Sequence, residues 1–557
     1  MAPQRTYPLM SRREVEAMIA DGHSLIVLNQ FVLKVDAWRG YHPGGDKVIL
    51  HMVGRDATDE VTVLHSPEAR RMMDRYRIGR IQWRWENLVP PIQGGVYVPL
   101  PLGDAPEVAL TSPSDASSSD ASSRAPSPVF EEQQPVRGRK KGDSRPWSDT
   151  SLSSSSSSPA VDEVEELPDG MAFLDLLTRK EIDLDHATYP PLDDLTQADI
   201  VQKYRDLNDR IRAAGLYECN YRAYAVEVAR YGLLFALMLL FLRWGWYATS
   251  GVLMGMFWHQ LVFSAHDAGH MGITHNFHLD TVIGIVIGDF LAGLSLGWWK
   301  ANHNVHHIIT NHPEHDPDIE YLPFLAVTHR YFKSLRSSFY DRVMEYDTAA
   351  KVLVRAQHYL FYPILLFGRF NLYRLSLEYL LLRKGPRKGP AWWHPYLELA
   401  GHAFFWYWYG YRIVYRSIPT NGGRFAYVML SHMVTMPLHL QLTLSHFAMS
   451  TADLGPRESF PQKMLRTTMD VDCPEWLDFF HGGLQFQAIH HLYPRIPRHN
   501  LRRAQALVRD FCRDVDIPYA MLGFVDGNKL VVGKLADVSR QAAILAKCHQ
   551  QSSTHTH

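Results

Sequence analysis

The chain has 557 residues with a net charge of −1, and its mean hydropathy of −0.20 averages very polar and very apolar stretches. The length exceeds that of a usual single domain, and the balanced charge excludes a bulk electrostatic attraction to nucleic acid. The four cysteines form no CxxC pair, which argues against a disulfide framework or a thiolate metal site. The 29 histidines are the compositional anomaly. The N-terminus lacks the apolar core of a signal peptide, so we expect the first domain on the cytosolic side.

Residues 1–100 are predicted to form a small α+β domain. Ser11 and Glu14 have the spacing of a capping box, and the run LIVLNQFVLKV is typical of β-structure. His42 precedes a Pro-Gly-Gly turn in YHPGGDKVIL, and His65 follows 23 residues later. Two imidazoles on opposite faces of a haem would fill both axial positions, which suits one-electron transfer. Surface histidines are the alternative for such a pair in isolation.

Residues 101–170 are rich in Ser, Pro and acidic side chains. Such a segment cannot bury enough apolar surface to fold, so we predict a disordered linker. It would give the first domain mobility, or serve only as a passive spacer.

Residues 171–540 are predicted to form an all-α body. Thr196 and Asp199 suggest a helix start, and an apolar stripe at helical spacing follows. About four transmembrane helices are expected, and a soluble helical protein is the alternative. A polar tail is expected over residues 541–557. The candidate apolar runs are 228–242 and 246–264, expected to form a hairpin, 279–299, expected to be re-entrant or interfacial, 359–382, expected to be interfacial, 397–414 and 425–444.

Three histidine clusters each follow an apolar run of the body. HDAGH has histidines at i and i+4, HNVHH at i, i+3 and i+4, and QAIHH repeats that pattern with a glutamine first. Each spacing turns its side chains toward one helix face. Seven histidines exceed the needs of one zinc ion, so two irons in a nitrogen-rich site fit better.

These motifs resemble two known families. Residues 7–90, with HPGG, GRDATDEV and RYRIGRI, resemble the cytochrome b5 domain. The clusters, with GWWKANHNVHH and TNHPEHDPDIEYLP, resemble the three histidine boxes of membrane fatty-acyl desaturases, in particular the front-end subgroup. The resemblance implies His42 and His65 as the axial ligands of haem b. It implies a catalytic site for two non-haem irons built from His266, His270, His303, His306, His307, His490 and His491, with Gln487 at the third-box glutamine position and His446 as an extra ligand.

Other side chains near the boxes have less defined roles. His275, His312 and His315 are expected to support the ligands or the fold. Asp267 and Asp316 could orient ligands, and packing or capping is an equal alternative. The third box reads QAIHH where many relatives have QIEHH, so an acidic contact is expected to be missing.

The resemblance implies an O2-dependent lipid desaturase that receives electrons from NADH through a separate NADH-cytochrome b5 reductase and the fused haem domain. The layout, with its Ser-rich insert, is similar to fungal sphingolipid Δ8-desaturases, which implies a double bond, expected to be trans, in the long-chain base of ceramide or a related sphingolipid. A Δ6- or Δ5-type acyl-lipid desaturase is the main alternative, followed by a membrane lipid hydroxylase and a haem-tethered sensor. We expect a multi-pass protein of the endoplasmic reticulum membrane, with the haem domain and the boxes facing the cytosol.

Overall fold

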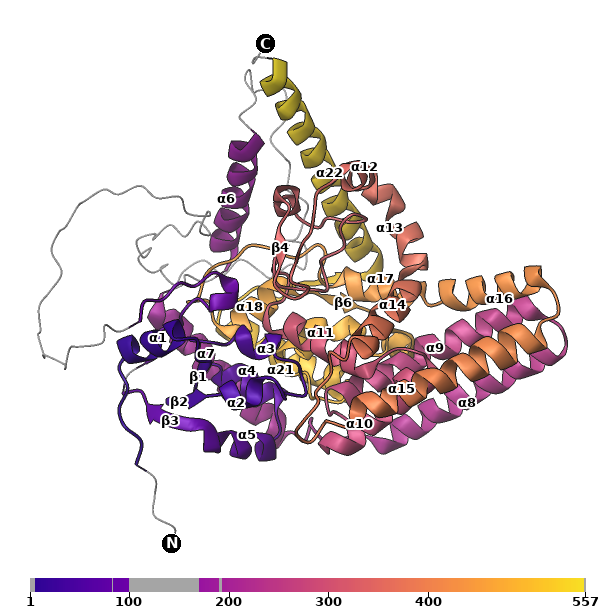
Figure 1. The fold of residues 1–557 in the computed structure, drawn as a ribbon, viewed down its shortest axis with the longest axis horizontal. Coiled ribbons are helices and arrows are strands. Elements are labelled where there is room, and N and C mark those ends of the chain that lie inside the picture. Colours follow the sequence, from indigo (N-terminus) through magenta and orange to yellow (C-terminus); the bar gives the residue numbers. More distant parts are fainter. Residues whose placement is uncertain (1–5, 83, 100–169, 190–192, 555–557) are drawn as a thin grey trace, which may run out of the picture.

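The computed structural model describes residues 6–82, 84–99, 170–189 and 193–554. A small N-terminal α+β unit packs against a larger helical body (Figure 1). The expected linker over residues 101–170 lies, apart from Gly170, outside the described residues, and its disorder stays a prediction.

The N-terminal unit is built on a three-stranded antiparallel sheet in the order β1-β2-β3. Its strands are β1 (Leu25–Leu28), β2 (Phe31–Lys34) and β3 (Arg77–Arg80). The predicted β-rich run is therefore two strands, divided at Asn29 and Gln30. These two residues have φ angles of 50° and 65°, as a tight hairpin turn requires.

Short helices pack around this sheet, and two of them lie in the segment between His42 and His65. The first helix begins with the predicted capping box, which is confirmed: the Ser11 hydroxyl accepts the Glu14 N–H, and the Glu14 carboxylate accepts the Ser11 N–H. The helices are α1 (Arg12–Ala20), α2 (Asp36–Arg39), α3 (Lys47–Leu50), α4 (Thr58–Leu64) and α5 (Pro67–Met73), with short 3₁₀ turns η1 (Asp74–Tyr76) and η2 (Pro91–Gln93).

The body is helical, as predicted, with two short two-stranded ladders added within its described residues. Its helices are α6 (Gly170–Thr188), α7 (Asp194–Ala213), α8 (Tyr221–Arg243), α9 (Tyr247–Gly269), α10 (Phe277–Ile285), α11 (Leu296–Ile308), α12 (Thr348–Arg355), α13 (Gln357–Leu366), α14 (Gly368–Leu381), α15 (His394–Phe405), α16 (Asn421–Met433), α17 (Met436–Leu444), α18 (Phe460–Thr467), α19 (Asp478–His481), α20 (Gln487–Leu492), α21 (Leu501–Asp514) and α22 (Phe524–Thr554). Two π-helical stretches, η4 (Val286–Leu291) and η6 (Trp406–Ser417), continue α10 and α15; the strands are β4 (Arg336–Ser337), β5 (Arg342–Val343), β6 (Asp470–Asp472) and β7 (Met521–Gly523).

Helix α7 begins three residues earlier than a capping box at Thr196 would place it. Asp193 is the N-cap, and its carboxylate accepts the backbone N–H groups of Leu195 and Thr196. The predicted cap at Thr196 is therefore wrong, because the preceding Asp is the stronger acceptor for the free N–H groups of the first turn. The predicted apolar stripe of this helix is buried, as expected.

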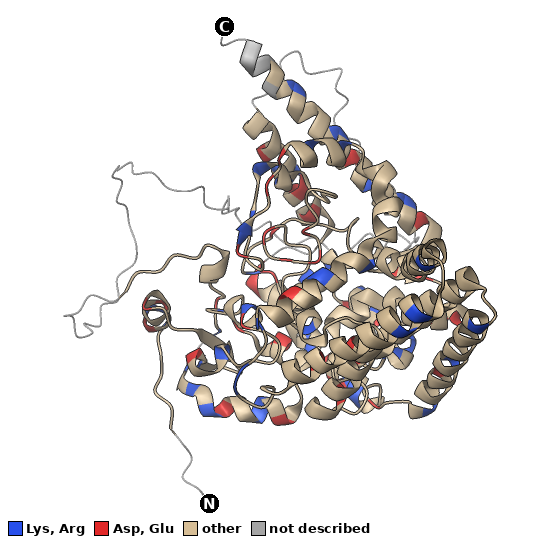
Figure 2. Cartoon of the chain, turned by 45° about the vertical axis from the view of Figure 1, so that its right-hand side comes forward, with Lys and Arg blue, Asp and Glu red and all other residues tan. Residues whose placement is uncertain are grey.

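Helices α8 and α9 form the predicted hairpin, and α16 lies against α9 (Figure 1). Figure 2 shows charged residues spread over both the N-terminal unit and the helical body, the projecting helices included. Among the described residues, α8 is the one helix that is by itself long and apolar enough to cross a membrane, and the bent pair α10–η4 with α11 is a second candidate if it counts as one span. The expected four spans therefore remain a prediction.

The run predicted to be re-entrant or interfacial changes direction sharply. The segment Phe277–Leu291 meets α11 at an angle of 116° across a break of a few residues. Ser295 caps α11 by accepting the N–H of Trp298, and its own hydroxyl donates to the buried Glu398 of α15. Because of this turn, α11 runs back into the body, and the second histidine cluster lies on α11.

The C-terminal helix α22 continues through the expected tail boundary at residue 541. Ala542, Leu545 and Cys548 are buried, and the first two belong to the same hydrophobic core as helices α6 and α13. Lys547 and Gln550 are exposed, so the polar composition concealed the buried stripe of a packed helix.

Candidate metal centres

The three predicted histidine clusters meet at the ends of distant helices. They lie in the last turn and C-cap of α9, along α11, and on the short helix α20. All of these histidines are buried except His266, whose ring is 18% exposed.

The end of α9 owes its position to a glycine. A Cβ atom on Gly269 would lie 2.1 Å from the Trp299 ring, so only glycine lets α9 and α11 approach this closely. The Trp299 ring in turn stacks on His303 with ring centres 4.5 Å apart, and its centre lies 5.3 Å from those of His266 and His270. The indole therefore orients histidines from two clusters.

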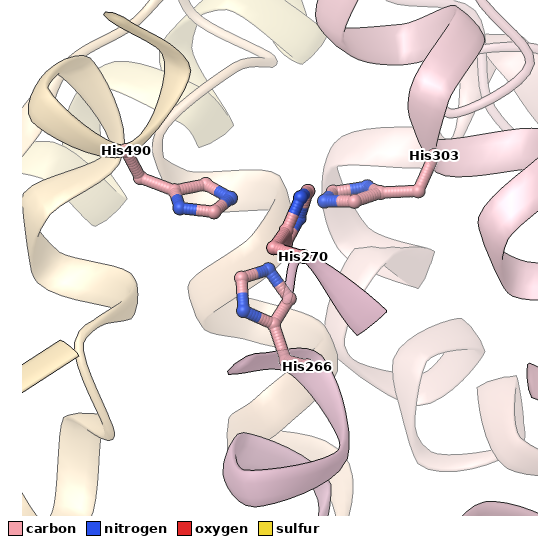
Figure 3. A group of neighbouring side chains, drawn as sticks. All are labelled: His266, His270, His303 and His490. Atoms are coloured by element: carbon pink, nitrogen blue, oxygen red, sulfur yellow. The ribbon is translucent and has the colours of Figure 1, made fainter. Parts of the chain in front are cut away.

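The first histidine group contains His266, His270, His303 and His490. One ligand nitrogen from each residue lies within 4.8 Å of all the others. Figure 3 shows the four rings converging from three separate segments. The ring centre of His490 lies 4.5 Å from that of His266 and 4.7 Å from that of His270.

The second group contains His306, His446 and His491, again with nitrogens within 4.8 Å of one another. The Nε2 atoms of His306 and His491 are 3.2 Å apart. His446, which only the resemblance pointed to, follows α17 and lies against both rings.

His307 lies between the two groups. Its Nε2 atom is 3.1 Å from Nε2 of His303, and its ring stacks on His491 with centres 4.3 Å apart. If each group bound one metal ion, His307 would lie next to both ions.

The chemistry of these side chains fits a pair of metal ions. Among the described residues, Nε2 of His270 and His490 and Nδ1 of His307 and His446 are buried without a hydrogen-bond partner. Burying such atoms unpaired is costly, and metal ligation would satisfy them. Burial also lowers the pKa of His490 and His491, which keeps both in the neutral form that binds metals.

Two carboxylates behind the second cluster hold its rings. The buried Asp316 lies 2.9 and 3.1 Å from Nδ1 of His306, and it also accepts the backbone N–H of Asn311. It thus both orients a ligand and stabilises the chain turn. Asp318, which the sequence analysis did not single out, lies 3.7 Å from Nδ1 of His303. A carboxylate on the outer nitrogen leaves Nε2 for the metal.

Several predicted residues lie outside both groups. Gln487 is buried at the start of α20, one turn before His490 and His491. Its role as a ligand stays a prediction. His275 bonds to two backbone carbonyls, and His312 and His315 stack on each other. Asp267 accepts from Arg498 and Tyr224 and also lies 3.9 Å from Nδ1 of His266, so both a packing role and a ligand-orienting role fit it.

The third box has a carboxylate nearby from another segment. Asp470 of β6 accepts the N–H of Ala488, the neighbour of Ile489, which stands where many relatives have the acid, and it also accepts from Tyr519 and Gln505. Burial raises the pKa of Asp470 to about 7. A carboxylate from another segment thus lies at the start of α20, contributed by a residue that sequence spacing gave no reason to select. The expected loss of an acidic contact within the box itself stays a prediction.

The N-terminal unit has a separate cavity between its two predicted haem ligands. The rings of His42 and His65 lie with centres 5.9 Å apart, and apolar side chains line the space around them. Nδ1 of His42 bonds to the Gly45 carbonyl and Nδ1 of His65 to the Val61 carbonyl, at 2.9 and 3.2 Å. Each ring thus keeps Nε2 free for a metal.

The electrostatics of this cavity suit a haem. Burial lowers the pKa of His42, and it lowers that of His65 to about 3, so both rings are neutral. The apolar lining matches a flat porphyrin, which two neutral imidazoles would hold from opposite faces.

Comparison with known proteins agrees with this arrangement. Residues 242–523 match the fatty acid desaturase family, and residues 11–82 match the cytochrome b5-like heme/steroid binding domain. A Delta 8-(E)-sphingolipid desaturase of Emericella nidulans is 58% identical over 99% of this chain and 98% of its own length. One from Kluyveromyces lactis is 46% identical over 97% of this chain and 94% of its own. A Delta(8)-fatty-acid desaturase of Helianthus annuus is 35% identical over 63% and 76%.

The fold and the site thus define an oxidoreductase in which a haem-binding domain is fused to a histidine-rich iron centre. The chain belongs to the fatty acid desaturase family and is similar over nearly its whole length to sphingolipid desaturases of that family.

Proposed function

We propose that this protein is a sphingolipid Δ8-desaturase that introduces a trans double bond into the long-chain base of ceramide or a related sphingolipid. The observation that carries the substrate is the similarity over nearly the whole chain, haem domain included, to relatives named for this reaction. The observation that carries the chemistry is the pair of adjacent histidine groups.

The side chains of the body would hold two irons in a nitrogen-rich site. The proposed ligands are His266, His270, His303, His306, His307, His446, His490 and His491, with Gln487 beside them. When bound and reduced, such irons supply O2-dependent hydrogen removal from an unactivated CH2–CH2, which acid–base chemistry cannot achieve. The protein's own part is to fix the rings through Trp299, Asp316 and Asp318, and to exclude water through burial.

The electrons would come from NADH through a separate NADH-cytochrome b5 reductase and then through haem b bound by His42 and His65. The proposed location is the endoplasmic reticulum membrane, with both metal sites on its cytosolic side.

Lipid analysis tests the substrate. The gene is expressed in a yeast that lacks Δ8-unsaturated bases, and long-chain bases and acyl chains are released and measured separately by mass spectrometry. A new trans double bond at C8 of the base is expected. A new bond in acyl chains would instead identify an acyl-lipid desaturase, and an added hydroxyl group would identify a hydroxylase. A His303→Ala variant provides the inactive control.

Absorbance spectroscopy tests the haem ligands. Either His42→Ala or His65→Ala is expected to remove the spectrum of a bis-imidazole haem, while His23→Ala, a partly exposed histidine of the same domain, leaves it intact. An unchanged spectrum in both ligand variants contradicts the assignment.

A further inference from the structure

The haem-binding unit sits directly on the helix that carries the second histidine cluster. Helix α11 presents His303, His306 and His307 on one face. At 3.6 residues per turn, Ala301, Asn304, Val305 and Ile308 lie on the opposite face. That opposite face is covered by the N-terminal unit: Val305 and Ile308 belong to the same hydrophobic core as Leu33, Val48 and Val61.

The loop of the first haem ligand makes the closest contact with α11. A Cβ atom on Gly44 would lie 2.6 Å from the Asn304 side-chain nitrogen, and one on Gly45 would lie 3.5 Å from the Ala301 side chain. Ile308 itself lines the cavity between His42 and His65. One helix, about 10 Å across, therefore separates the haem cavity from the histidine groups.

The segment of the second haem ligand also contacts a metal-binding segment. The Arg495 guanidinium donates to the backbone carbonyl of His65 at 3.0 Å. Arg495 lies four residues beyond His491, at the end of the third histidine box. The segments that carry the two predicted haem ligands thus both contact segments that carry histidine boxes. The His42 loop contacts α11, and His65 contacts the chain just after the third box.

Charged side chains at the edges fix the orientation of the two parts. Lys47 of α3 bonds to Asp341 of the body at 2.8 Å, and Asp59 of α4 bonds to Arg205 of α7 at 2.7 Å. These pairs lie on two different body segments, so they hold the unit against rotation about α11.

We infer that the outer face of α11, with Asp341 and Arg205 at its edges, is the intramolecular docking site through which electrons enter the iron centre. The inference rests on the proposed function, and it adds the surface over which the transfer occurs. The haem that His42 and His65 would hold supplies one electron at a time. Two such transfers, each followed by re-reduction of the haem through the NADH-dependent reductase, would reduce the two irons that the histidine groups would hold.

Zero-length cross-linking tests the docked arrangement in the intact membrane-bound holoenzyme. A carbodiimide joins an amine to a carboxylate only where the two are in direct contact, so a cross-link between Lys47 and Asp341 is expected. The pair Lys333 and Asp175, 2.6 Å apart in the body, is the positive control. Formation of the control cross-link without that of Lys47 and Asp341 overturns the inference, whatever the lipid analysis shows.

Charge reversal tests whether electrons use this surface. In Asp341→Lys, anaerobic oxidation of the reduced haem by the iron-loaded body is expected to slow about tenfold, because repulsion at the rim of an interface weakens productive docking. Lys47→Asp combined with Asp341→Lys is expected to restore the rate. The matched control is Asp526→Lys, the same charge change on an exposed residue of α22. All variants should retain the haem spectrum.

The kinetic outcomes are decisive in both directions. A slowed rate that the compensating pair restores supports docking at α11. An unchanged rate in Asp341→Lys, or one slowed equally by Asp526→Lys, overturns it. Wrong products in the lipid analysis would overturn the substrate assignment and leave this result standing.

Discussion

At the scale of single residues, the metal site depends on carboxylates that would not touch the metals. Asp316 is fully buried, and both of its oxygens face Nδ1 of His306. Such a contact fixes the ring orientation and increases the basicity of the ligating nitrogen.

Removing the charge of Asp316 should therefore weaken the second metal position. In Asp316→Asn, iron affinity is expected to fall about 10- to 100-fold. Metal analysis of the purified protein after graded chelation measures this fall. Asp453→Asn, which removes a carboxylate 3.6 Å from the non-ligand His312, is the control and should retain its iron. Equal iron retention in both variants would contradict the role of Asp316.

Asp470 gives the protein a pH dependence. Its pKa in the folded state, about 7, lies above the usual value of 3.8 because the carboxyl group is buried. The folded state therefore holds this proton more tightly than the unfolded state does. The resulting stabilisation is complete below about pH 4 and is lost as the pH rises through 7.

The Asp470→Asn variant cannot titrate at this position. The difference in Tm between the parent protein and the variant is expected to shrink as the pH rises from 4 to 7, measured by thermal unfolding in detergent. A difference that stays constant over this range would show that another group is responsible.

At the scale of elements, the contact between α9 and α11 determines whether the clusters meet. The two helices can approach because Gly269 has no side chain where the Trp299 ring lies. The short helix α20 completes the site, and its first turn is held by Asp470 from β6.

Adding one methyl group to this contact should disturb the first histidine group. In Gly269→Ala, the Trp299 ring must shift and its stacking on His303 is disturbed, so we expect about tenfold lower iron affinity together with lower desaturase activity. Gly533→Ala, on α22 with no atom within 4 Å of the added carbon, is the matched control. Iron content measured beside the activity separates loss of metal from general unfolding.

At the scale of the whole molecule, the haem-binding unit is a structural partner of the body as well as its proposed electron donor. Val305, Ile308 and Ile309 of the body are less than 5% exposed because that unit covers them. Removing the unit would expose these side chains, each worth about 1.5–3 kcal/mol of burial.

Deleting residues 1–100 should therefore have two separable effects. Desaturation is expected to stop unless free cytochrome b5 is supplied, and the Tm of the body is expected to fall. The comparison is full-length His42→Ala/His65→Ala, which should lose electron transfer yet keep the covered surface and most of the stability. Full activity of the truncated protein without any added donor would contradict the proposed electron route.

The sequence alone determined the histidine positions, the two-part organisation and the resemblance that named the axial haem ligands. These depend on local spacing, since i, i+3 and i+4 positions on a helix must share a face wherever the helix lies. It did not determine the cap of α7, because Asp193 and Thr196 offer similar signals that only backbone geometry separates. Nor did it show that α22 continues past residue 541.

Only the tertiary structure decided how the clusters divide into two groups, with His307 between them, and which acids stand behind them. Asp318 and Asp470 contact their partners through packing between segments that no spacing rule relates. The placement of the haem cavity against the outer face of α11 has the same origin. Local sequence fixes which side chains share a helix face, and long-range packing fixes what that face meets.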